Sequence, residues 1–208
     1  MIVKVCGMRD AENIRELDRL HIADWMGFIF YPKSSRYVAT LPEYMPQYSK
    51  RIGVFVNEDI HNIVRICKDF NLHIIQLHGN ESPDYCRQLK NAVGPDVGIM
   101  KTIPLSTSAD MLQSQSFQDC SDYLLFETKC SGYGGSGQQF DWHILDGYNG
   151  DRPFLLTGGI GPEDAEKIKQ FTHPKMAGID LNSRFESGPA VKDIRALNQF
   201  INKLRSYE

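Results

Sequence analysis

One cysteine is placed where a reactive side chain could act on a bound ligand. Cys6 ends the apolar run 2–6, precedes Gly7, and is well separated in sequence from the other four cysteines. A thiolate is a good base and nucleophile, and a glycine lets a ligand approach the backbone closely. On its own, a cysteine in this position is more often a small buried packing residue. The groups described next favour a catalytic role.

A carboxyl group ends another apolar run. Glu127 closes the run 123–127. A carboxyl group at the end of a buried strand is costly to desolvate, so its presence there favours a role in proton transfer. If the fold brings Glu127 opposite Cys6, the two side chains could act as a paired acid and base.

Small residues after the seventh and eighth apolar runs predict a phosphate site. Gly158 and Gly159 precede a predicted helix start, and paired glycines let backbone N–H groups converge on an anion. The eighth run ends in polar residues that could complete this site, namely Asp180, Asn182 and Ser183. A phosphate cradle beside an acid and a base would suit chemistry on a sugar phosphate.

Three further side chains are expected to contact the substrate. Arg36 follows the second run and could hold a carboxylate with its planar donors, although a surface ion pair explains this segment equally well. Gln76 and His78 end the fourth run, and a ligand-lining or structural role is favoured for His78 over a catalytic one. The glycine-rich segment 133–138 precedes Phe140, which predicts a lid over the site.

Eight short apolar runs would have to position these side chains. They alternate with amphipathic segments such as 60–70 and 194–204, at a spacing that fits repeated strand–loop–helix units. We therefore predict that residues 1–208 form one domain, an α/β protein with a (β/α)8 TIM barrel, whose site lies at the carboxyl ends of the strands. A doubly wound open sheet is the alternative, but Cys6-Gly7 stands where that fold often carries a glycine fingerprint. The expected strands are 2–6, 25–30, 51–56, 73–77, 97–103, 123–127, 154–157 and 177–181.

The helix signals differ in strength along the chain. Ser82 followed by Pro83 predicts a capped helix start, and a second start is predicted at Gly161-Pro162, where acidic residues follow. The segment 106–117 is polar and weakly periodic, so the fifth helix is the least well supported.

The composition excludes several classes of function. The net charge is −3 and no dense basic cluster occurs, so nucleic acid is not an expected partner. No apolar stretch reaches membrane-spanning length, and the N-terminus lacks the regions of a signal peptide. The five scattered cysteines and six dispersed histidines show no metal-ligand spacing, which predicts a reduced, cytoplasmic protein without a metal site.

Taken together, the motifs resemble the phosphoribosylanthranilate isomerase family along essentially the whole chain. The resemblance implies a (β/α)8 barrel that converts N-(5-phosphoribosyl)anthranilate into 1-(2-carboxyphenylamino)-1-deoxyribulose 5-phosphate, in tryptophan biosynthesis, without a metal or cofactor. Both monomers and homodimers suit a barrel of this size. The segments that carry the resemblance to this family are Lys4-Val5-Cys6-Gly7, 27–30 with Ser35-Arg36-Tyr37, 53–57, Gln76-Leu77-His78-Gly79, 133–137 with Phe140-Asp141-Trp142, and Gly158-Gly159.

The resemblance also implies roles for individual residues. Cys6 matches the family's general base, Arg36 its contact with the anthranilate carboxylate, and Asp180 an acidic residue near the site. Gly158 and Gly159 match its phosphate loop. Glu127 aligns with the general acid.

Two positions depart from the family pattern. The family normally has aspartate where this chain has Glu127, which moves the carboxyl group by about 1 Å, a displacement that can cost on the order of 100-fold in rate. Asn182-Ser183-Arg184 replaces a run of smaller residues, so the sequence does not decide how this segment binds the phosphate group.

Two other functions therefore stay in competition with isomerisation. A phosphosugar-binding barrel with little or no catalysis is the main alternative, because of the altered acid. Indole-glycerol-phosphate synthesis is disfavoured, because for its expected lysine acid the strand ends offer mainly Lys4 and Lys101.

Overall fold

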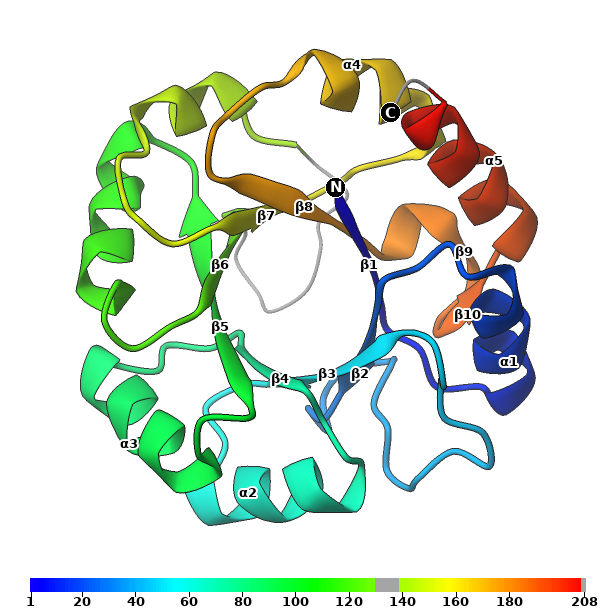
Figure 1. The fold of residues 1–208 in the computed structure, drawn as a ribbon, viewed down its shortest axis with the longest axis horizontal. Coiled ribbons are helices and arrows are strands. Elements are labelled where there is room, and N and C mark those ends of the chain that lie inside the picture. The colour runs from blue at the N-terminus through cyan, green and yellow to red at the C-terminus, as the bar shows by residue number, and fades with distance from the viewer. Residues whose placement is uncertain (130–138, 207–208) are drawn as a thin grey trace.

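Eight parallel strands close into a barrel, in the order in which they occur in the sequence (Figure 1). The computed structural model describes residues 1–129 and 139–206. Closure comes from pairing of the last strand with the first, which confirms the predicted barrel and shows the open-sheet alternative to be wrong. The strands are β1 (Ile2–Cys6), β2 (Trp25–Ile29), β3 (Lys50–Phe55), β4 (Ile74–Leu77), β5 (Gly98–Leu105), β6 (Tyr123–Thr128), β7 (Phe154–Leu156) and β8 (Met176–Leu181).

The barrel interior changes in character along the strands. Side chains alternate between the two faces of a strand, so every second residue points inward. One layer of the interior is apolar, and its buried residues are Trp25, Ile52, Ile74, Met100, Leu125 and Leu155. Nearer the carboxyl ends the buried side chains become polar and charged, as in Lys4, Gln76 and Asp180. The apolar layer thus supports a polar layer at the end of the barrel where the site is expected.

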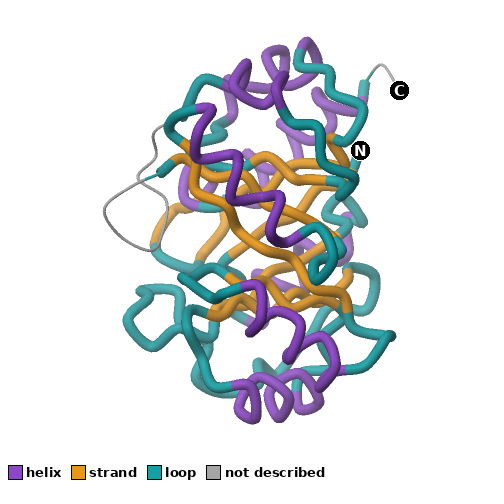
Figure 2. Tube along the Cα trace, turned by 90° about the vertical axis from the view of Figure 1, so that its left-hand side faces the viewer, coloured by secondary structure: helices purple, strands orange, loops and turns teal. Residues whose placement is uncertain are grey.

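Helices surround the barrel, and most begin at a side-chain cap. Figure 2 shows the strands in the centre with helices on either side of them. Asp10, Asp59, Ser82 and Asp193 each accept a hydrogen bond from a backbone N–H of the first helical turn. The α-helices are α1 (Ala11–Leu20), α2 (Ile60–Asp69), α3 (Pro83–Val93), α4 (Ala165–Gln170) and α5 (Ile194–Arg205). Among the described residues, no helix is long and apolar enough to cross a membrane.

Irregular segments complete the ring of helices. The polar segment after β5 forms a 3₁₀ helix, η1 (Ser108–Phe117), instead of an α-helix, in line with its weak periodicity. The helix start predicted at Gly161 is a short 3₁₀ turn, η3 (Pro162–Asp164), which leads into α4. No helix follows β2, where residues 30–49 form a loop. The remaining elements are η2 (Trp142–Gly147), η4 (Ser183–Phe185), and an unpredicted hairpin of β9 (Glu186–Gly188) and β10 (Val191–Lys192) before α5.

Candidate active site

A cavity of about 400 Å³ opens at the carboxyl ends of the barrel strands. Parallel strands all end on the same side of a barrel, so residues far apart in sequence meet there. The side chains and loops that line this cavity include all ten predicted site residues: Cys6, Arg36, Gln76, His78, Glu127, Gly158, Gly159, Asp180, Asn182 and Ser183. The structure therefore brings together every residue that the sequence analysis selected as catalytic or substrate-binding.

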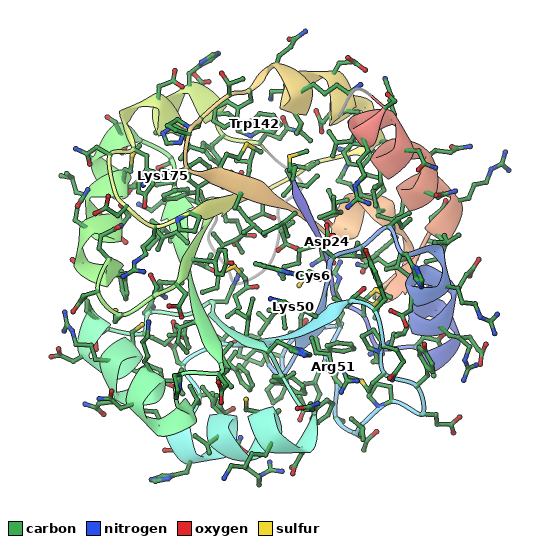
Figure 3. All side chains as sticks on the ribbon, viewed as in Figure 1. Cys6, Asp24, Lys50, Arg51, Trp142 and Lys175 are labelled. Carbon is green, nitrogen blue, oxygen red and sulfur yellow. The ribbon has the colours of Figure 1, made fainter. Side chains whose placement is uncertain are left out.

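Cys6 is buried near the axis of the barrel (Figure 3). Gly27 on the neighbouring strand makes room for it, because a Cβ atom at position 27 would lie 2.8 Å from the Cys6 sulfur. Burial raises the pKa of the Cys6 thiol above its ordinary value, and Asp180 adds to this effect. The ammonium groups of Lys4 and Lys192 lower the pKa of the thiol, but by less than burial raises it. These two lysines supply the positive potential that a thiolate at this position requires.

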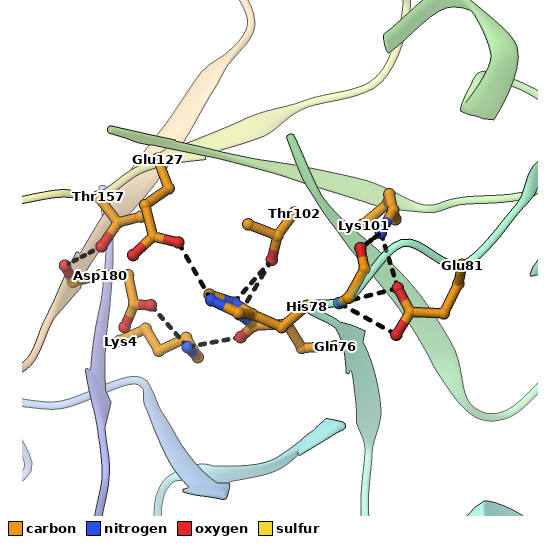
Figure 4. Close-up of polar contacts among 10 residues, drawn as sticks. Lys4, Gln76, His78, Glu81, Lys101, Thr102, Glu127, Thr157 and Asp180 are labelled. Atoms are coloured by element: carbon orange, nitrogen blue, oxygen red, sulfur yellow. Dashed lines mark hydrogen bonds and ion pairs between the residues drawn. The ribbon is translucent and has the colours of Figure 1, made fainter. Parts of the chain in front are cut away.

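Lys4 joins the first, fourth and last strands of the barrel. Its Nζ donates to Asp180 Oδ2 at 2.7 Å and to Gln76 Oε1 at 2.8 Å (Figure 4). Burial lowers the pKa of the Lys4 ammonium, but the Asp180 carboxylate and, when it is ionised, the Cys6 thiolate raise it more, so that the net pKa is above its ordinary value. Asp180 Oδ1 is buried and has no hydrogen-bond partner among the described residues, which leaves an acceptor available in the wall of the cavity.

Glu127 and His78 face each other across the mouth of the barrel. The Glu127 Oε2 atom lies 3.1 Å from His78 Nε2, and their side chains are only 13% and 15% exposed, respectively. His78 Nδ1 lies 3.1 Å from Gln76 Nε2 and 3.2 Å from Thr102 Oγ1. The candidate acid is therefore held by a chain of polar side chains that begins at Lys4 (Figure 4).

The guanidinium group of Arg36 lines the cavity, but part of it is already paired. Its Nε and Nη2 atoms donate to the Glu186 carboxylate at 2.8 and 2.6 Å. The same carboxylate accepts a hydrogen bond of 2.7 Å from Lys192, which also donates to Asn182 Oδ1 at 2.7 Å. A substrate carboxylate at Arg36 would have to share this guanidinium with Glu186.

The predicted phosphate loop follows β7. Gly158 has a φ of +98°, and a Cβ atom there would collide with the Oγ1 and N atoms of Thr128. Gln139 Nε2 donates to the carbonyl of Gly159 at 3.1 Å, which ties the segment after β6 to this loop. Arg184 also lines the cavity and forms an ion pair with Glu163 at the start of η3. The Arg184 guanidinium and a backbone turn that requires glycine thus lie together at this end of the cavity.

Two buried lysines, Lys4 and Lys101, lie outside the lining of the cavity. Neither Lys4 nor Lys101 is among the described residues that line the cavity, and Lys101 is instead paired with Glu81 at 2.8 Å. The segment 133–138, predicted as a lid, lies outside the described residues. Phe140 and Trp142, which follow it, are buried.

Sequence reasoning missed several residues that shape the site. Lys4 was named only in the family motif and as the lysine of a disfavoured alternative, although it lies two residues before Cys6 and therefore points into the barrel beside it. Thr102 also lies on an inward-facing strand position. Because threonine is common in strands, its presence there gave no sign of a role in the site. Glu186 and Lys192 come from the hairpin before α5, which no sequence pattern predicted.

Comparisons with known proteins agree with this architecture. A family model for N-(5'phosphoribosyl)anthranilate (PRA) isomerase matches residues 3–203. The chain is 51% identical to the N-(5'-phosphoribosyl)anthranilate isomerase of Phocaeicola vulgatus over 205 residues, covering 99% of this chain and 98% of the relative. It is 47% identical to the enzyme of that name from Parabacteroides distasonis, covering 98% of this chain and 93% of the relative.

Solved structures show the same similarity. The crystal structure of phosphoribosyl anthranilate isomerase from Thermotoga maritima superimposes with a TM-score of 0.83 at 31% identity, covering 99% of this chain and 100% of that one. A structure of the enzyme in complex with reduced 1-(o-carboxyphenylamino)-1-deoxyribulose 5-phosphate gives a TM-score of 0.79 at 28% identity, with the same coverage. The chain belongs to the N-(5'-phosphoribosyl)anthranilate isomerase family and is an isomerase of tryptophan biosynthesis.

Proposed function

We propose that the described cavity carries out the Amadori rearrangement of N-(5'-phosphoribosyl)anthranilate, with Cys6 as the general base and Glu127 as the general acid. The observation that carries this proposal is the meeting of both groups in one cavity with the Gly158–Gly159 loop. An acid and a base beside an anion cradle are what ring opening and proton abstraction on a sugar phosphate require. The relatives' shared activity supports catalysis over a purely binding role.

The proposed reaction begins with ring opening. Protonated Glu127 donates its proton to the ribose ring oxygen as the bond from that oxygen to C1 breaks, and the anthranilate nitrogen forms a protonated Schiff base at C1. The Cys6 thiolate then removes the proton from C2, and the electron pair of that C–H bond forms the C1–C2 double bond of an enolamine.

The reaction ends with a second pair of proton transfers. The enolamine hydroxyl at C2 returns a proton to the Glu127 carboxylate, and C1 takes the proton from the Cys6 thiol. The product is a 1-amino-2-ketose, and both side chains regain their starting protonation states. No atom is gained or lost overall, as an isomerisation requires.

The remaining lining residues are assigned to binding. The backbone at Gly158 and Gly159, with Asn182 and Ser183, would hold the phosphate group. The carboxylate of the substrate would bind Arg36 beside Glu186. The available Oδ1 atom of Asp180 would accept a hydrogen bond from a sugar hydroxyl group, and Gln76 and His78 would border the same part of the cavity.

The proposal is tested by following the fluorescence of phosphoribosylanthranilate with the unmodified protein and with Cys6→Ala and Glu127→Gln. We expect turnover by the unmodified protein and a loss of at least 100-fold in kcat for each variant, because general acid–base groups contribute about 10² to 10⁴ in rate. Binding of the reduced product analogue should persist in both variants. Near-normal turnover by either variant would remove that residue from the mechanism.

The same assay separates the isomerase from the phosphosugar-binding alternative. A protein that binds the analogue but leaves the substrate unchanged would support the binding role. Turnover by the unmodified protein excludes that role.

A further inference from the structure

The contact between Glu127 and His78 depends on the length of the glutamate side chain. Glu127 extends from β6 and His78 from the end of β4, and their facing atoms lie 3.1 Å apart. An aspartate at position 127 would draw the carboxyl group back by about the length of one C–C bond, beyond hydrogen-bond reach of the imidazole. The length of Glu127, the feature that the sequence analysis singled out, is thus also what makes this contact possible.

The protonation of His78 follows from the chain of donors behind it. The Lys4 ammonium can only donate, so the Gln76 atom that it contacts at 2.8 Å is the amide oxygen. The NH₂ group of Gln76 therefore faces His78 Nδ1 at 3.1 Å. A donor at this distance requires Nδ1 to be an acceptor without a proton.

Thr102 is consistent with this assignment. Its hydroxyl oxygen accepts a hydrogen bond from the same Gln76 NH₂ group at 3.2 Å, and its own hydrogen can be directed at His78 Nδ1, 3.2 Å away. The Thr102 contact is therefore compatible with the acceptor role of Nδ1 that the Gln76 NH₂ group requires. The single ring proton of neutral His78 must then be on Nε2, which is the atom that faces Glu127.

We infer that His78 is a positioning residue that holds the Glu127 carboxyl group through its Nε2–H and so adapts this barrel to a glutamate as the acid. When Oε2 accepts from His78, the acidic proton of Glu127 is confined to Oε1. A fixed donor oxygen would offset the displacement caused by the additional methylene group. This inference rests on the proposed role of Glu127 as the general acid.

A first experiment measures the tautomer and needs no turnover. A long-range ¹H–¹⁵N spectrum of the ligand-free protein, assigned by comparison with His78→Asn, should show His78 protonated at Nε2 and unprotonated at Nδ1 at neutral pH. Gln76→Glu replaces the donor by a carboxylate acceptor, and it should move a proton to Nδ1. A proton on Nδ1 in the unmodified protein would overturn the inference.

A second experiment is a double-mutant cycle on kcat. His78→Leu should lower kcat by about ten- to 100-fold in the unmodified background, because a buried hydrogen bond to the acid is lost. In the Glu127→Asp background, which should retain turnover, the same substitution should cost less than about threefold. His78→Gln keeps an N–H donor of similar reach and should recover part of kcat.

A surface pair of the same chemistry provides the control. His143 Nδ1 lies 3.3 Å from the Asp146 carboxylate on η2, where both side chains are exposed, and His143→Leu should leave kcat unchanged. Equal costs of His78→Leu in the two backgrounds would overturn the positioning role. Absence of turnover in the unmodified protein would instead overturn the proposed function, and the tautomer measurement distinguishes the two failures.

Discussion

Cys6 is subject to two opposing electrostatic effects. Burial and the nearby Asp180 carboxylate favour the neutral thiol, whereas the Lys4 and Lys192 ammonium groups favour the thiolate. The net effect is a raised pKa, so the thiol form dominates in the ligand-free protein at neutral pH. The proposed base therefore depends on the two lysines for the fraction that is ionised.

Alkylation of Cys6 measures this dependence. Because the pKa of the thiol is raised, the rate of its reaction with iodoacetamide should increase from pH 7 to pH 10. Lys192→Met removes a positive charge and raises the pKa further, so the rate at a given pH below the pKa should fall. Peptide mass mapping identifies the modified cysteine. An unchanged rate in the folded variant would show that Lys192 does not act on the thiol.

At the scale of elements, the loop after β7 shapes the phosphate end of the cavity. Gly158 adopts a φ of +98°, a region that side-chain-bearing residues rarely enter, and it lies against Thr128 at the end of β6. A side chain here would both strain the backbone and push the loop away from β6. The glycine is thus required by local geometry as well as by the ligand.

Gly158→Ala should therefore raise KM and weaken binding of the product analogue by tenfold or more, while kcat falls less. Gly94→Ala is the matched control, since Gly94 also has a positive φ of +80° but a Cβ atom there would meet nothing within 4 Å. Both substitutions should lower stability by about 1 to 3 kcal/mol from the backbone strain, and Gly158→Ala should lower it further because of the collision with Thr128. Equal effects of the two on KM, measured by steady-state kinetics, would contradict the assignment of the loop.

The elements also show what the sequence could and could not predict. Strand β1 was predicted with its observed bounds, because short apolar runs bounded by polar loops are typical of buried parallel strands. The segment of η1 had the wrong helix type, since its polar residues give no periodicity. Glu186 and Lys192 reach the site only through the β9–β10 hairpin, whose pairing is a tertiary feature. Residues at strand ends and in the segments that directly follow them were therefore predictable, and those delivered by the hairpin were not.

At the scale of the whole molecule, the strand pairing that closes the barrel also brings the residues of the site together. The pairing of β1 with β8 sets Lys4 level with Asp180, two residues that are 176 positions apart. Their ion pair is buried, and breaking such a pair by removing one partner leaves an uncompensated charge in the interior. The polar chain that holds Cys6, Gln76 and His78 thus exists only when the ring is closed.

The loop between β2 and β3, where no helix forms, is held by one carboxylate. Asp18 on α1 accepts hydrogen bonds from the Tyr44 hydroxyl and from the backbone N–H groups of Gln47, Tyr48 and Ser49, which hold the loop that leads into β3. Burial raises the pKa of Asp18, but these hydrogen bonds lower it more, so that the net pKa is below its ordinary value. A closed barrel has no edge strand, so loosening this loop affects the stability of the whole ring.

Asp18→Asn should lower the free energy of unfolding by about 1 to 3 kcal/mol at pH 7, because hydrogen bonds to a charged acceptor are replaced by weaker ones. A carboxylate with a lowered folded pKa stabilises the protein above its unfolded value of about 3.9, and this contribution is lost as the pH falls through the folded value. The difference between the two proteins should therefore shrink below about pH 4. Urea unfolding at pH 7 and pH 3.5 measures it, with Asp69→Asn as the control, since its exposed pair with Arg65 contributes little. A difference that persists unchanged at pH 3.5 would mean that the Asp18 charge is not what secures the loop.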